Sequence, residues 1–172
     1  MNELIPQYRA MAAGGEQFHG LSVLQHVTSI RKLAHSVKAK SMLDFGCGRG
    51  DAYRSPHKLH QQIGIPRRNV KLYDPAFPQH DVIPKGRWDL VVCSDVLEHV
   101  PSDDVPAFLD GLFTRANKAV WLSVCCRLAK KTFPGTDVNL HVTIQPYLRW
   151  HEAVSRASVA AGTVPFILVE TP

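Results

Sequence analysis

The sequence lacks a long apolar run and a leader-like start. None of its apolar stretches approaches the roughly 18 residues that a membrane-spanning helix needs. The N-terminal stretch MNELIPQYRAMAAGG has no basic segment followed by an apolar one, which argues against a secretory signal. From these two absences we expect a cytoplasmic protein that does not contact membranes.

Cysteine is also scarce, and no CxxC or Cys/His spacing typical of zinc is present. We expect the four cysteines to be buried free thiols in a reducing compartment: Cys47, Cys93, Cys125 and Cys126. His57 and His60 stand one helical turn apart, but no further ligands accompany them. The sequence therefore predicts no metal site.

Strong charge of one sign is absent as well. The chain has 172 residues and a formal net charge of +5, which is too diffuse to indicate nucleic acid by itself. A mildly basic chain is compatible with an anionic partner. The length suits a single domain over residues 1–172, and nothing in the sequence sets the oligomeric state.

Apolar patterning alternates between the periods of strands and helices. Short apolar runs predict strands at residues 41–45, 70–73, 88–93, 118–125 and 166–169. Three- and four-residue spacing predicts helices at residues 21–37, 104–115 and 146–161. Ser102 or Asp103 is the expected N-cap of the second helix. This alternation favours an α/β fold with a mostly parallel sheet and helices on both faces.

The stretch SMLDFGCGRGD, residues 41–51, ends a predicted strand and continues into Gly46, Gly48 and Gly50. Parallel sheets bind ligands at the carboxyl ends of their strands, and glycine lets the backbone approach a ligand closely. A ligand site is therefore indicated, with a tight packing turn as the alternative. The spacing GxGxG lacks the third glycine of the dinucleotide pattern GxGxxG, which argues against a dehydrogenase.

Asp74 ends the next predicted strand, in the stretch YDPAF. A carboxylate at such a strand end accepts hydrogen bonds from both hydroxyls of a ribose. The same stretch is good turn chemistry, so Asp74 alone leaves both interpretations open. Together with the glycine loop, ribose binding is the better hypothesis.

Three stretches in order, LDFGCGRG, YDPAF and WDLVVCSDVLEHVP, resemble motifs I, II and IV of the class I S-adenosylmethionine-dependent methyltransferases. The resemblance implies a Rossmann-like fold, S-adenosyl-L-methionine as cofactor and S-adenosyl-L-homocysteine as product. Residues 1–40 would form an N-terminal helical cap, and residues 41–172 the cofactor-binding sheet. The resemblance assigns cofactor binding to Asp44, Gly46, Gly48, Gly50, Asp74, Pro75, Ala76, Phe77 and Ser94.

The chain departs from that family after Asp74. Only residues 75–87 precede Trp88, where the family usually has a helix and another strand, and a crossover alone takes at least about 10–12 residues. We therefore expect the helix to be absent and residues 80–83 to form at most a stub of edge strand. The C-terminal end is short as well, so the expected sheet is reduced to about five or six strands.

Methyl transfer from a sulfonium is an in-line displacement, in which a protein aligns the two reactants and excludes water. A base is needed only where the acceptor must lose a proton. Our catalytic candidates are Asp95, which alternatively caps the following turn, and His141, in a loop before a helix. His99 is more typical of a structural residue, and Glu98 of a helix cap or a solvent-facing side chain.

Two further groups bear on the acceptor. Arg127, Lys130 and Lys131 form either a solvated loop or a recognition site for phosphate or carboxylate. Tyr8, Phe18 and Trp150 form either a wall of the acceptor pocket or part of the core.

The stretch SDVLEHVP stands where a DNA amino-methyltransferase carries a [DNS]PP[YFW] box, which argues against a nucleic-acid acceptor. We therefore expect methyl transfer to a small acceptor, which the basic cluster would allow to be anionic. The alternative is a catalytically inactive or regulatory module that binds S-adenosylmethionine.

Overall fold

A five-stranded parallel sheet forms the centre of the computed structural model, which describes residues 4–15 and 18–171. The strands are β1 (Met42–Phe45), β2 (Val70–Tyr73), β3 (Trp88–Ser94), β4 (Ala116–Cys125) and β5 (Phe166–Thr171). They lie in the order β2-β1-β3-β4-β5, and all neighbouring pairs are parallel. The predicted α/β fold, with a Rossmann-like, doubly wound sheet, is confirmed.

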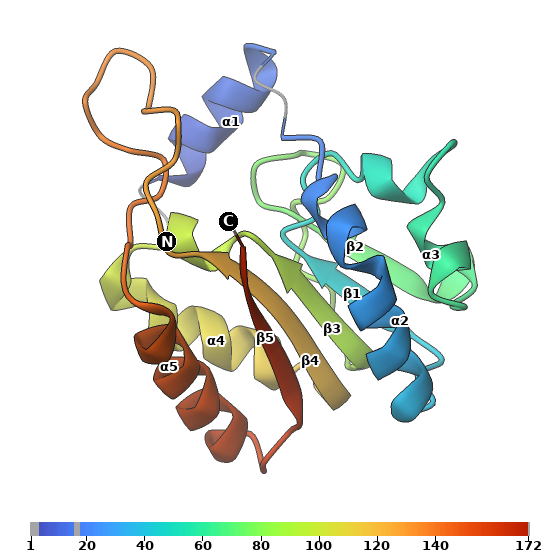
Figure 1. Ribbon diagram of the computed structural model, residues 1–172. Coiled ribbons are helices and arrows are strands. Elements are labelled where there is room, and N and C mark those ends of the chain that lie inside the picture. Colours follow the sequence, from blue (N-terminus) through green and yellow to red (C-terminus); the bar gives the residue numbers. More distant parts are fainter. Residues whose placement is uncertain (1–3, 16–17, 172) are drawn as a thin grey trace.

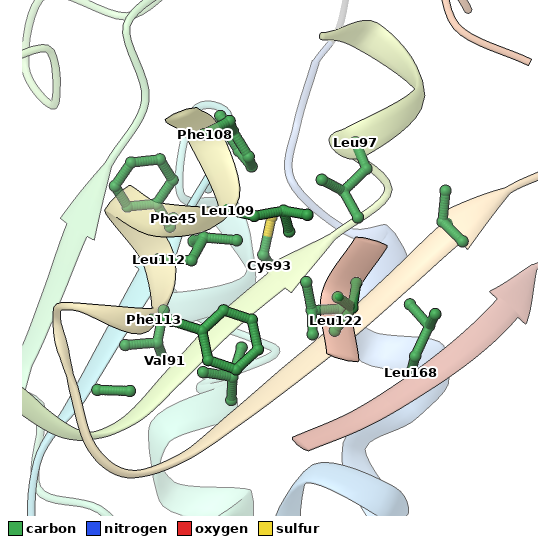
Figure 2. Close-up of a cluster of buried hydrophobic side chains, with 14 of the residues drawn as sticks. Phe45, Val91, Cys93, Leu97, Phe108, Leu109, Leu112, Phe113, Leu122 and Leu168 are labelled. Atoms are coloured by element: carbon green, nitrogen blue, oxygen red, sulfur yellow. The ribbon is translucent and has the colours of Figure 1, made fainter. Parts of the chain in front are cut away.

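Helices cover both faces of this sheet (Figure 1). One face carries α4 (Val105–Phe113) and α5 (Tyr147–Ala160), and the other carries α2 (Val27–Ser36) and α3 (Leu59–Gln62). Burial on both sides explains why β3 reads as a nearly continuous apolar run. Figure 2 shows Leu109 and Leu112 of α4 beside Cys93 of β3, within the larger core cluster.

Two helix predictions need correction at their beginnings. The helix expected over residues 21–37 is divided into a 3-10 turn, η1 (Ser22–His26), and α2. Helix α4 follows another 3-10 turn, η5 (Ser102–Asp104), and its N-cap residue is Asp104, whose side chain makes no capping bond. The predicted cap at Ser102 or Asp103 is therefore wrong. The remaining 3-10 turns are η2 (Asp51–Tyr53), η3 (Arg67–Asn69) and η4 (Leu97–His99).

The connection from β2 to β3 is as short as the sequence indicates. Residues 74–87, all described, form turns without a helix, and residues 80–83 form no strand. The amide of Asp74 donates to His80 O at 3.0 Å, and that of His80 donates to Phe77 O at 2.8 Å. These bonds fold the segment back on the end of β2. Because the segment adds no further strand, β2 is at the edge of the sheet.

The N-terminal part divides between two places. Helix α1 (Ile5–Ala13) lies at the carboxyl ends of the strands, beside the loop formed by residues 126–146 (Figure 1). Helix α2 instead packs on a face of the sheet, so only α1 takes the position of a cap. Within residues 4–15 and 18–171, no helix is both long and apolar enough to cross a membrane.

The burial of Trp150 and of the cysteines tests two further expectations. Trp150 is fully buried between α5 and the sheet, so it belongs to the core and not to a pocket wall. All four cysteines are free; Cys47 and Cys93 are buried, whereas Cys125 and Cys126 are partly exposed.

Candidate functional site

A cavity of about 400 Å³ opens at the carboxyl ends of β1, β2 and β3, where α1 and residues 18–22 complete its wall. Its volume lies in the range of small-molecule sites, which are mostly apolar with a few convergent polar groups. Eight of the predicted site residues line it: Gly46, Gly48, Asp74, Pro75, Ala76, Phe77, Ser94 and Asp95. The other three, Asp44, Gly50 and His141, do not line it.

The glycine loop makes room for the chain as well as for the cavity. At Gly48, where φ is +57°, a Cβ atom would lie 2.4 Å from Phe18 O. The amide of Arg49 donates to the same oxygen at 2.9 Å, so residues 18–20 cross directly over the loop. At Gly46 a Cβ would lie 2.3 Å from the Val96 side chain. The same glycines therefore allow residues 18–20 and Val96 to pack closely on the loop, and they also line the cavity.

Asp74 presents its carboxylate to the cavity from the end of β2. Its Oδ2 accepts from the amide of Gly48 at 2.8 Å, and its Oδ1 accepts from the amide of Ala76 at 2.9 Å. Each carboxylate oxygen keeps a second lone pair for a ligand hydroxyl. Burial raises the pKa of Asp74, against the two amide donors, which lower it.

Asp44 is almost fully buried beneath the glycine loop and does not reach the cavity. Its Oδ2 accepts a hydrogen bond from the Tyr53 hydroxyl at 2.7 Å. Burial raises the pKa of Asp44 to about 7, in spite of that hydrogen bond. The residue therefore fixes Tyr53, in the 3-10 turn that follows the glycine loop.

Asp95 lies on the cavity wall just past β3, in the left-handed region with φ of +54°. Its Oδ1 accepts from Ser123 Oγ at 2.8 Å and from Thr171 Oγ1 at 3.0 Å. Its alternative role as an N-cap is wrong, because Val96 is the N-cap residue of η4 and no side chain caps that turn. Ser94 lies beside it, with Oγ 3.0 Å from Ser123 Oγ.

Tyr8 and His99 join α1 to the far wall of the cavity. Tyr8 Oη donates to Leu140 O at 2.9 Å and lies 3.0 Å from His99 Nδ1. Both residues line the cavity, as does Phe18, whose ring meets that of Tyr8 edge-on at 6.0 Å. Burial, with a smaller contribution from His141, lowers the pKa of His99 to about 4, so its imidazole is neutral at ordinary pH.

His141 and Glu98 lie behind that wall. The ring of His141 stands nearly perpendicular to that of His99, with centroids 4.9 Å apart. Glu98 was expected to cap a helix or face solvent, but it is fully buried, and its Oε1 accepts from the amide of Cys125 at 3.1 Å. Burial, aided by Asp95, raises the pKa of Glu98 to about 8. The sequence pattern around Glu98 does not predict that this carboxylate is buried.

The basic cluster does not reach the cavity. Neither Arg127 nor Lys130 nor Lys131 lines it, and the described wall contains no lysine or arginine. Arg9 of α1 instead donates from Nε to Pro75 O at 2.7 Å and forms an exposed ion pair with Asp81 at 3.0 Å. Helix α1 is therefore attached on both sides of the cavity, through Tyr8 and through Arg9.

A parallel sheet in the order β2-β1-β3-β4-β5, with its cavity where the chain connections diverge from β1, has the architecture of a Rossmann-like ligand-binding protein. A family model described as a methyltransferase domain matches residues 23–154, which is most of the chain. The chain belongs to this family, within the class I S-adenosylmethionine-dependent methyltransferases. No curated protein matches the sequence.

Proposed function

We propose that this chain transfers the methyl group of S-adenosylmethionine to a small acceptor bound in the apolar part of the cavity. The observation that carries this proposal is the position of Asp74. Its carboxylate is fixed by the amides of Gly48 and Ala76, lines the cavity, and keeps lone pairs for the two hydroxyls of a ribose.

The rest of the cofactor side fits the same ligand. Gly46 and Gly48 expose backbone to the cavity where any side chain would collide with neighbouring atoms. Pro75, Ala76 and Phe77 supply an apolar surface for the adenine. Asp44 and Gly50 act from behind the wall, as positioning residues that shape the loop.

Bound S-adenosylmethionine supplies a methyl group that its sulfonium has already activated. The protein therefore has to align the acceptor and keep water out. Ser94 and Asp95 lie at the end of β3, and the hydroxyls of Ser123 and Thr171 hold Oδ1 of Asp95. Its other oxygen has no hydrogen-bond partner in the described part of the chain and takes up a proton where the acceptor must lose one.

The wall beyond Asp95 supports a largely apolar acceptor. It consists mainly of Tyr8, Val96, Val100 and Phe108, and His99 is neutral there. Since no lysine or arginine lines the described cavity, we propose a neutral acceptor. We propose His141 as a positioning residue that acts through His99. The free thiols suit a reducing compartment such as the cytoplasm.

Calorimetric titration with S-adenosylmethionine, S-adenosylhomocysteine and NAD tests the cofactor assignment. We expect the two adenosyl compounds to bind and NAD not to bind. Asp74→Ala removes a charged hydrogen-bond acceptor and is expected to weaken cofactor binding by about 10- to 100-fold. Asp110→Ala, on the exposed face of α4, is the matched control and should leave the affinity unchanged. Equal affinity of the two variants would refute the role of Asp74.

Turnover distinguishes an enzyme from an inactive binding module. Formation of S-adenosylhomocysteine is measured with a panel of small neutral and anionic acceptors. Product that depends on one neutral, largely apolar acceptor supports the proposal. Tight cofactor binding without product from any acceptor would favour the regulatory module instead.

A further inference from the structure

A second group of polar side chains lies behind the cavity wall. Glu98 and His99 belong to η4, after β3, and His141 comes from the loop of residues 126–146 beside α1 (Figure 1). One potential ligand atom from each of the three side chains lies within 4.8 Å of the other two. No part of the proposed cofactor site uses this juxtaposition.

Both imidazoles are oriented by backbone carbonyls. His99 Nδ1 lies 2.9 Å from Leu140 O, and His141 Nδ1 lies 2.6 Å from Arg127 O. A carbonyl only accepts, so each ring carries a proton on Nδ1, which leaves Nε2 as the nitrogen that can bind a metal. Metal-binding histidines are held in this way, with one ring nitrogen donating to a carbonyl or carboxylate.

Glu98 supplies the second, independent observation. Its side chain is fully buried, and one oxygen, Oε1, accepts from the amide of Cys125. The other oxygen, Oε2, is buried without a hydrogen-bond partner in the part of the chain that the structure describes. A buried carboxylate oxygen without a partner is costly, and a bound cation removes that cost.

We propose that Glu98, His99 and His141 form a binding site for a first-row divalent cation, with Zn²⁺ as the first candidate. Two imidazoles and one carboxylate are a donor set of zinc sites that keep an open position, whereas Mg²⁺ and Ca²⁺ prefer oxygen ligands. Donor atoms about 2.1 Å from one ion lie roughly 3.0–3.4 Å apart. The three potential ligand atoms that lie within 4.8 Å of one another therefore need to approach by less than about 2 Å, and His141 is only partly buried.

The position of the site suggests what the ion does. Since three protein ligands leave a coordination position open, and since His99 also lines the cavity, that position lies beside the cavity. There the ion would polarise the hydroxyl of the acceptor and stabilise the alkoxide or phenoxide that forms when this hydroxyl gives its proton to Asp95. This role rests on the proposed function, whereas the binding of the ion does not.

Calorimetric titration of the chelator-treated full chain with ZnCl₂ tests the site. We expect one Zn²⁺ per chain, with Mg²⁺ binding far more weakly. Glu98→Gln and His141→Ala each remove one ligand and should weaken Zn²⁺ binding by at least about 100-fold. His35→Ala, at an exposed histidine on α2, is the matched control and should bind like the wild type. Co²⁺ in place of Zn²⁺ reports two nitrogen ligands through its visible spectrum.

Absence of stoichiometric Zn²⁺ binding would overturn the proposal, as would unchanged affinity in either ligand variant. His141→Ala keeps the test valid where the buried Glu98→Gln variant does not fold. Titration of S-adenosylmethionine into the chelator-treated chain separates the two proposals. Cofactor binding without Zn²⁺ binding overturns only the metal site, and Zn²⁺ binding without cofactor binding overturns only the proposed function.

Discussion

The two sides of the cavity are held in different ways. On the side of β1 and β2, backbone amides of the glycine loop and of the following turn hold Asp74. On the side of β3, side-chain hydroxyls do this work, since Ser123 and Thr171 hold Asp95, and Tyr8 contacts His99. On the first side, the backbone conformation of the loop allows few residue types. On the second side, substitution of one hydroxyl residue removes one hydrogen bond and leaves the others in place.

Among the variants considered, Gly48→Ala is expected to lower the free energy of unfolding most. The new Cβ would meet Phe18 O and the backbone of Gly20, and φ at position 48 is unfavourable for alanine. We expect a loss of about 3 kcal/mol or more in the free energy of unfolding, measured by denaturant titration. The control is Gly135→Ala, which has a similar positive φ but open space, and it should lose only about 1 kcal/mol. Equal losses would mean that the close approach of residues 18–20 contributes nothing.

Asp44, which is buried on the glycine side of the cavity, is expected to make the free energy of unfolding depend on pH. Its folded-state pKa is about 7, above the value of the unfolded chain, so the folded protein keeps the proton longer. Stability from this group is therefore present at low pH and is lost as pH rises through 7. Between pH 6 and 8 the loss amounts to about 1 kcal/mol.

The Asp44→Asn variant provides the comparison for that slope. Asparagine has the same shape and still accepts from the Tyr53 hydroxyl, but it does not titrate. Its free energy of unfolding should vary less between pH 6 and 8 than that of the wild type. Parallel profiles for the two proteins would show that Asp44 does not titrate in this range.

The two attachments of α1 give the smallest expected effects. Tyr8→Phe removes the hydroxyl that contacts Leu140 and His99, and should cost about 1 kcal/mol, since the bond is partly buried. Arg9→Ala removes an exposed ion pair with Asp81 and should cost less than about 1 kcal/mol. Hydrogen exchange of the α1 amides measures both. A larger effect of Arg9→Ala would reverse the assignment of the stronger attachment.

The glycine side could be predicted from the sequence because its determinants are local. Gly46, Gly48 and Asp74 stand at the ends of apolar runs whose length and spacing mark them as strands. The missing helix was also predictable, because thirteen residues, 75–87, are too few for a crossover helix and a strand. The sequence pattern predicts the structure of this side because residues close together in the sequence determine it.

The opposite side depends on contacts between distant parts of the chain. Tyr8 meets His99, and Asp95 meets Thr171, across separations that no local pattern encodes. Glu98 has the sequence context of an exposed turn, yet the end of β4 covers it. Trp150 shows the same limit, since only the packing of α5 decides between pocket wall and core.

The sheet order has a consequence for how the protein folds. Strand β1, which carries the glycine loop, pairs with Val70 of β2 and Leu90 of β3, and both partners follow later in the chain. Parallel pairing over such separations is slow, because loop closure precedes any gain from contact. The cavity is therefore complete only after β1 has paired with both β2 and β3. A ligand that binds this edge should slow unfolding and leave the refolding rate almost unchanged.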